Sequence, residues 1–359
     1  MNYCKRCVAA SLIVLLLPIS MWGWGYEGHI WINQVAASKI PRDMPAFFRR
    51  EKKLIAHLGY EPDRWRDSRD VSLRSFQAPD HYIDFELITD IAELPRERYD
   101  FYRLLYEKRA VALATPAGKA AGGASVKSDD LLPEGVGLQP YITMEVYERL
   151  RTAFREYRAL KLENKSTREV ERNVVFYGGW LGHYVADGSQ PMHTSIHHHG
   201  WVGENPGEYT TDGKIHSQFE SLYVAANLKA SDFQGLVQAP VRLADPFADY
   251  VKYLRESNQQ IEEFYRLEKT GAFAGPGTPA GHEFTRRCLA RGSQMLLNLW
   301  YTAWLESAEP APPRRPFDRE AGPPPKYPMA PPPLELGLHL HRGHRPGDNP
   351  GHAGRREPR

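Results

Sequence analysis

Residues 177–193 read YGGWLGHYVADGSQPMH, and this apolar, glycine-rich segment is typical of a buried helix. His183 and Asp187 lie four residues apart within it. On a helix such residues share one face, with about 5–6 Å between their Cβ atoms. His193 follows the helix, where a chain that turns back could add a third side chain. The segment therefore fits either an ion pair on a helix surface or part of a metal site.

A second segment, residues 212–220, reads DGKIHSQFE and repeats the same spacing between His216 and Glu220. One such pair is usually an ion pair, but two pairs close together in the chain are harder to explain in that way. Imidazole and carboxylate groups together suit zinc. The rest of the sequence has to decide between a metal site and two ion-paired helices.

Composition limits the classes of function. The 359 residues include 46 Lys and Arg and 44 Asp and Glu, so the formal net charge is only +2. This balance argues against a surface coated with basic residues for nucleic acid, and it leaves a local basic groove open. The three cysteines are Cys4, Cys7 and Cys288, which provide no disulfide framework. We expect Cys288 to be a core residue.

The first residues are typical of a signal peptide. Lys5 and Arg6 precede an apolar run over residues 8–19, which is too short for a confident membrane span. We therefore predict a signal peptide over residues 1–23 and a secreted or periplasmic product. If cleavage leaves Trp24 first, its α-amino group and carbonyl oxygen could chelate a metal.

The hydrophobic pattern predicts a mostly helical protein without long strands. Asp245 followed by proline predicts a capped helix start. A Gly-, Ala- and Ser-rich stretch over residues 115–140 predicts a loop, and the Pro- and His-rich residues 309–359 predict a disordered tail. The predicted helices cover residues 30–40, 45–58, 141–162, 170–186, 245–272 and 278–307.

Further acidic and histidine residues lie outside the two helical pairs. Asp63 precedes Arg66 in one segment, and His81 precedes Asp84 in a segment that we expect to be extended or irregular. Taken singly, each of these is most simply a surface residue. The three histidines at 197–199 do not share one face of a regular element, and we expect them in an exposed loop.

Taken in chain order, these residues form one set: Trp24-x4-His29, Asp63, His81, His183-x3-Asp187-x5-His193 and His216-x3-Glu220. In this set the chain resembles the zinc-dependent phosphodiesterases that include bacterial zinc phospholipase C and the single-strand-specific nucleases of fungi and plants. The resemblance covers residues 24–308. It implies an all-α, multi-helix catalytic domain in which these residues hold three zinc ions in a cleft.

The resemblance also implies a role for each residue. Trp24 and His29 would bind one zinc, Asp63, His81 and His183 a second, and His193, His216 and Glu220 a third. Asp187 would bridge the first two ions, and Asp63 could orient the attacking water. Arg66 would meet the substrate phosphate as a fork donor. Water activated by the zinc pair would attack phosphorus in line, and the third ion would stabilise the leaving oxygen.

Two details of the set point in different directions. Glu220 is the acid typical of the phospholipases. The spacing from Trp24 to His29, the separation of His193 from His216 and the sequence His81-Tyr-Ile-Asp84 are nuclease-like. We expect a monomeric nuclease of single-stranded RNA or DNA without a stable protein partner. The alternatives are a zinc-dependent phospholipase C or other phosphodiesterase, and a non-catalytic zinc-binding protein.

A feature of the cleft rim should separate these alternatives. A nuclease needs an aromatic platform on which a base can stack, whereas a phospholipase needs an apolar rim that accepts a lipid. The sequence offers four candidates for such a platform: Phe76, Tyr82, Tyr141 and Trp201.

Overall fold

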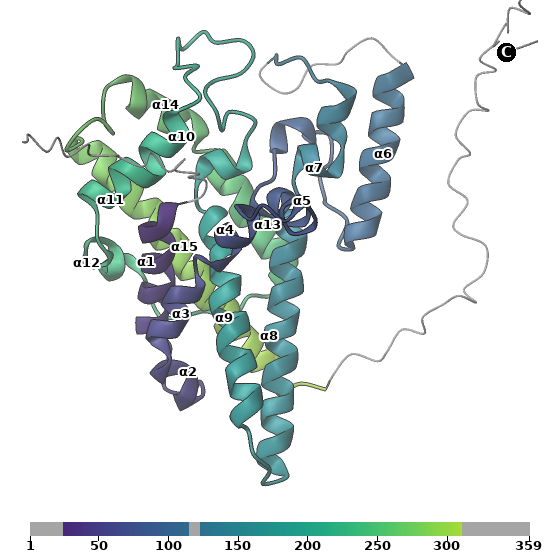
Figure 1. Cartoon of the computed structure of the whole chain (residues 1–359), viewed down its shortest axis with the longest axis vertical. Coiled ribbons are helices and arrows are strands. Elements are labelled where there is room, and N and C mark those ends of the chain that lie inside the picture. Colours follow the sequence, from purple (N-terminus) through teal and green to yellow (C-terminus); the bar gives the residue numbers. More distant parts are fainter. Residues whose placement is uncertain (1–23, 115–122, 311–359) are drawn as a thin grey trace, which may run out of the picture. The chain divides into compact units, whose positions relative to one another are not determined.

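Helices make up the framework of the part of the chain that the structure describes, residues 24–114 and 123–310 of a computed structural model. These residues form α, 3-10 and π helices joined by turns, and no β-strand occurs among them (Figure 1). The prediction of an all-α fold is confirmed. The predicted signal peptide and residues 311–359 of the predicted tail lie outside the described residues, so the domain boundaries stay predictions.

The first half of the described chain contains mostly short helices. Their bounds are α1 Gly25–Ser38, α2 Ala46–Arg50, α3 Lys52–Leu58, α4 Glu61–Arg66, α5 Val71–Gln77, η1 Ala78–His81, η2 Phe85–Leu87, α6 Arg98–Ala114, η3 Ser128–Leu131 and α7 Pro133–Val136. The predicted helix over residues 45–58 is thus two helices. The described part of the predicted loop over residues 115–140 contains η3, α7 and the start of the next helix.

The second half contains the long helices. Their bounds are α8 Gln139–Leu162, α9 Arg168–Asp187, η4 Pro191–Thr194, α10 Ile215–Ser217, η5 Gln218–Tyr223, α11 Val224–Asn227, α12 Ala230–Phe233, η6 Gln234–Leu236, α13 Pro246–Asn258, α14 Ile261–Lys269 and α15 Pro279–Glu306. The single helix predicted over residues 245–272 is wrong, because α13 and α14 are separated at residues 259–260. The predicted start at Asp245 is confirmed, since its side chain accepts a hydrogen bond from the Ala248 amide at 3.2 Å.

The core forms where α1, α3, α8 and α15 pack around α9. In Figure 1, α8 and α9 run side by side as an antiparallel hairpin, so the C-terminal end of α9 lies near the start of α8. Glycines on α9 let neighbouring helices approach closely: a Cβ at Gly182 would lie 1.8 Å from Oδ1 of Asn33 on α1. This contact fixes α1 against the part of α9 that carries His183.

Two further observations bear on the predictions, one on Cys288 and one on the length and hydropathy of the helices. Cys288 on α15 is completely buried, as expected of a core residue, and burial raises the pKa of its thiol to about 12. None of the described helices is both long and apolar enough to cross a membrane.

Candidate metal centre

Side chains from six helical elements meet at the C-terminal end of α9. His183 and Asp187 lie on the last turns of α9, and the other contributors come from α1, α4, η1, η4 and the α10–η5 segment. Each of these side chains is at least nine-tenths buried. The predicted ligands in this group are His29, Asp63, His81, His183, Asp187, His193, His216 and Glu220.

Two groups of potential ligand atoms share His183. One group is His29, His183 and Asp187, the other is Asp63, His81 and His183, and the ligand atoms within each group lie within 4.8 Å of one another. The Asp187 carboxylate faces both groups. Its Oδ1 lies 3.3 Å from Nε2 of His29, and its Oδ2 lies 3.1 Å from Nδ1 of His81 and 3.3 Å from Nε2 of His183. This geometry suits a carboxylate that bridges two cations.

A third group consists of His193, His216 and Glu220. Nε2 of His216 lies 2.9 Å from one Glu220 oxygen, and Nε2 of His193 lies 3.6 Å from the other. The two imidazole nitrogens are 3.2 Å apart. Glu220 lies in a π-helical stretch, a rare conformation that occurs frequently at functional sites.

Backbone carbonyls hold three of the imidazoles in orientation. Nδ1 of His183 donates to the Gly59 carbonyl at 2.8 Å, and Nδ1 of His193 donates to the His81 carbonyl at 2.8 Å. Nδ1 of His216 similarly lies 3.0 Å from the His198 carbonyl. Because a carbonyl can only accept, Nδ1 carries a proton in each ring, and Nε2 is the nitrogen that a metal could bind in place of a proton. Metal-binding histidines are commonly oriented in this way.

Several buried polar atoms of the centre have no hydrogen-bond partner among the described residues. They include Nε2 of His29 and Oδ1 of Asp187, which lie 3.3 Å apart, and Oε1 of Glu220, which lies 2.9 Å from Nε2 of His216; neither contact has the geometry of a hydrogen bond. Burying such a group without a partner costs about 1–3 kcal/mol. A divalent cation would satisfy these atoms together, so the residues fit a metal ion.

Protonation states favour the same interpretation. Burial lowers the pKa of His29 and lowers that of His81 well below its ordinary value, so both rings are neutral at pH 7. Although burial opposes it, the neighbouring His193 holds the pKa of Asp187 well below its ordinary value. Against the lowering effect of burial, Asp187 and Glu220 raise the pKa of His193 to about 9. Neutral imidazoles and ionised carboxylates are the forms that bind metals, and the carboxylates that hold a second proton on His193 would equally favour a metal cation in its place.

Trp24 lies at the start of α1 beside this centre. Its completely buried ring donates from Nε1 to the Ala186 carbonyl at 2.7 Å and to Oγ of Ser189 at 2.9 Å. Gly25 follows with a φ of +62°, and a Cβ there would lie 3.2 Å from the Glu220 carbonyl. The chain thus passes directly against η5 at this point. The role of the Trp24 amine stays a prediction, because it depends on whether and where the predicted signal peptide is cut.

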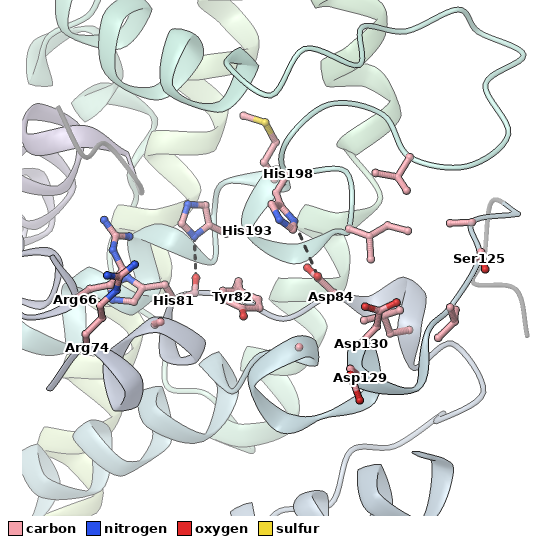
Figure 2. A pocket seen from close by; sticks show the side chains of 18 of the residues that line it. Arg66, Arg74, His81, Tyr82, Asp84, Ser125, Asp129, Asp130, His193 and His198 are labelled. Carbon is pink, nitrogen blue, oxygen red and sulfur yellow. Dashed lines mark hydrogen bonds and ion pairs between the residues drawn. The ribbon is translucent and has the colours of Figure 1, made fainter. Parts of the chain in front are cut away.

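A pocket of about 730 Å³ opens from the centre. His81 and His193 form part of its wall, and Figure 2 shows Arg66 and Arg74 together on one side of it. Arg66 is nearly buried, and its Nη2 lies 2.8 Å from Oδ1 of Asp63. The structure therefore places the predicted phosphate-binding arginine between a candidate ligand and the pocket.

The other side of the pocket is acidic, as Figure 2 shows for Asp84, Asp129 and Asp130. Asp84 is only 4% exposed, and its Oδ1 has no hydrogen-bond partner in the described part of the chain. Burial, with the nearby Glu86 carboxylate, raises the pKa of Asp84 well above its ordinary value. The prediction that Asp84 is a surface residue is wrong, because its side chain is buried. In the sequence, only its position three residues after His81 connects Asp84 with the candidate site.

Several other predictions can be compared with the structure. The expectation that residues 197–199 form an exposed loop is wrong for His197, which is buried and stacks on Trp201 with ring centroids 4.0 Å apart. Of the four candidate platform residues, Tyr141 is buried in the core and Trp201 is engaged in this stack. Tyr82 lines the pocket, and Phe76 is exposed.

Comparison with known proteins adds little to this geometry. No protein-family model matches the chain, and no curated protein matches it. Among solved structures, the alpha-toxin of Clostridium perfringens from avian strain SWCP aligns with 78% of the chain at 12% sequence identity, with a TM-score of 0.34. The aligned region spans 63% of the toxin chain. A likeness at this level carries no argument about fold or function.

Proposed function

We propose that the protein is a zinc-dependent phosphodiesterase of the phospholipase C type. The observation that carries the proposal is the meeting of three groups of buried His, Asp and Glu ligand atoms beside a pocket that also contains arginine. Mixed imidazole and carboxylate donors suit zinc better than magnesium or calcium, which prefer oxygen alone.

The ligand set of the proposal follows the three groups. His29, Asp63, His81, His183 and Asp187 would hold a pair of ions, with the Trp24 amine added if processing exposes it. The remaining group of histidines and glutamate would hold a third. When bound, zinc supplies Lewis acidity toward phosphoryl oxygens and activates water.

The protein's own side chains would do the rest. Arg66, held by its ion pairs with Asp63 and Asp67, is set to receive a phosphate oxygen beside the ligands. Asp63 lies at the junction of the ligands and the pocket, where its carboxylate could orient an attacking water. Hydrogen bonds to backbone carbonyls keep the imidazoles in place, so little reorganisation accompanies the reaction.

The choice of phospholipid rests on the charge of the pocket. An anionic phosphate fits the side with Arg66 and Arg74, and a cationic headgroup fits the side with Asp84 and Asp130. Asp84 lines the pocket, and an ammonium group beside it would favour its ionised form against the effect of burial. Nucleic acid has no corresponding cation, and two of the four expected platform aromatics are engaged elsewhere. Cleavage of single-stranded nucleic acid therefore stays the second outcome of the test.

Hydrolysis of phosphatidylethanolamine, phosphatidylglycerol and single-stranded DNA tests this proposal. We expect zinc-dependent cleavage of phosphatidylethanolamine, with Asp84→Asn lowering the ratio of its rate to that of phosphatidylglycerol by about tenfold. Asp129→Asn is the matched control, because Asp129 lines the same pocket but is already paired with Arg109 at 2.9 Å. Cleavage of DNA alone would replace the proposal with the nuclease.

Other expectations belong to the same proposal. The protein would be exported by its signal peptide to the periplasm or the medium, and it would act as a monomer. A non-catalytic zinc-binding protein that uses the His-rich tail is the alternative of another class; bound metal without turnover, lost when the tail is deleted, would favour it.

A further inference from the structure

Helix α5 carries apolar side chains that the protein does not bury. The helix spans Val71–Gln77 and has no buried residue. Val71 is 81% exposed and Phe76 is 75% exposed, and Leu73 is also exposed. We call Val71, Leu73 and Phe76 the α5 ridge. None of the three packs against the hydrophobic core of the described chain.

Such a helix is unusual in water. Isolated helices shorter than about 12–15 residues are marginal, and most helices in proteins are stabilised by packing an apolar face. The α5 ridge has the apolar residues but lacks the packing. Leu73 and Phe76 lie three residues apart and are therefore neighbours on the helix surface, and Val71 extends the exposed apolar surface at the start of the helix. Contiguous exposed apolar surface marks interaction sites, whereas scattered single residues do not.

Charge around the ridge points to an anionic partner. Arg69 precedes the helix and Arg74 lies within it; both are exposed, and neither guanidinium makes an ion pair or hydrogen bond with a described residue. The nearby Asp70 carboxylate accepts a hydrogen bond from Ser68 at 2.8 Å. Arg74 and Ala78, at the end of α5, line the pocket beside the metal centre. The end of the helix that carries the ridge thus borders the proposed catalytic pocket.

We propose that the α5 ridge docks the protein on the surface of an anionic lipid membrane. Interfacial anchors combine apolar residues, which enter the boundary between headgroups and acyl chains, with arginine or lysine, which binds anionic headgroups. Two of the three ridge residues are aliphatic. Single-stranded nucleic acid would instead require aromatic stacking platforms. The choice of lipid rests on the proposed function, since docking would bring headgroups to the pocket.

Vesicle binding tests this inference. Full-length protein is mixed with vesicles of phosphatidylcholine containing phosphatidylglycerol, and bound protein is measured by sedimentation. We expect the triple variant Val71→Ser, Leu73→Ser, Phe76→Ser to bind about tenfold more weakly. Arg69→Gln should bind about fivefold more weakly, with the difference disappearing on vesicles of phosphatidylcholine alone.

A matched triple variant controls for the loss of apolar surface in general. Leu162→Ser, Leu236→Ser, Val241→Ser changes exposed side chains on other elements, and it should bind like the wild type. Hydrolysis of monomeric dihexanoylphosphatidylcholine separates docking from catalysis. The α5 triple variant should keep this activity and its zinc content, because the ridge contacts neither the ligands nor the core.

Each outcome has a defined meaning. Equal vesicle binding by the wild type and the α5 triple variant would overturn the inference, and so would a wild type that does not bind vesicles. Binding of single-stranded DNA that depends on the ridge, without vesicle binding, would replace lipid with nucleic acid. Ridge-dependent vesicle binding without any hydrolysis would support docking while refuting the proposed function.

Discussion

Gly182→Ala should destabilise the protein and disturb the metal centre. The added Cβ would lie 1.8 Å from Oδ1 and 2.6 Å from Cγ of Asn33. Asn33 cannot turn away freely, because it is completely buried and its Nδ2 donates to the Ile55 carbonyl at 2.8 Å and the Gly179 carbonyl at 2.9 Å. The substitution must therefore either move α1 away from α9 or break these hydrogen bonds.

The size of the effect follows from the two costs. Overpacking a well-packed core costs about 1–3 kcal/mol, and each buried carbonyl that loses its donor costs about 1–3 kcal/mol. We expect the free energy of unfolding to fall by about 2–5 kcal/mol, a large part of the stability of an ordinary domain. The next residue, His183, stacks on His29 with ring centroids 4.1 Å apart. Moving α1 from α9 separates these ligands, so bound zinc should fall as well.

Urea unfolding of the metal-free protein, with zinc content measured in parallel, checks this prediction. Gly235→Ala is the matched control, because a Cβ there meets nothing within 4 Å, and its effect should stay within about 0.5 kcal/mol. The double variant Asn33→Ala, Gly182→Ala removes the clashing atoms, so its cost should be smaller than the sum of the single costs. A stable Gly182→Ala protein, or strictly additive costs, would refute the reasoning.

Three further predictions concern the ligands, a helix cap and the tail. Asp187→Asn should abolish hydrolysis and reduce bound zinc, because the carboxylate faces two ligand groups; metal analysis and turnover check this, and wild-type activity would refute it. Asp245→Ala should lower the free energy of unfolding by about 1 kcal/mol at neutral pH. Hydrogen bonding from Arg96 lowers the pKa of Asp245, so the difference should shrink as pH falls through that pKa. A chain lacking residues 309–359 should keep its turnover, and an inactive truncated enzyme would contradict the predicted role of the tail.

The sequence predicts those helices that are marked by a pattern of residues close together in the chain. α8, α9 and α15 follow from apolar periodicity, and α13 begins where Asp245 and Pro246 predict. The break at residues 259–260 has no glycine or proline to mark it. The helical turns in the predicted loop are stabilised by contacts with other segments of the chain. The periodicity of apolar residues does not reveal such contacts.

The candidate site is predictable to a similar degree. Four-residue spacing marks His183 with Asp187, and His216 with Glu220, because a single helix brings each pair together. Asp63 comes from a separate helix, so no local pattern connects it with these pairs, and only the resemblance to a known family grouped them. The burial of His197 against Trp201 also required the folded chain, since neither residue has a sequence signal for the contact.

Zinc content and turnover of the purified mature protein, before and after chelation, test the central claim most directly. Phosphatidylethanolamine and single-stranded DNA would serve as substrates. The proposal predicts tightly bound zinc, close to three ions per chain, and phospholipid hydrolysis that chelation abolishes and added zinc restores. A protein without tightly bound zinc, or with zinc but no hydrolysis of either substrate, would contradict it.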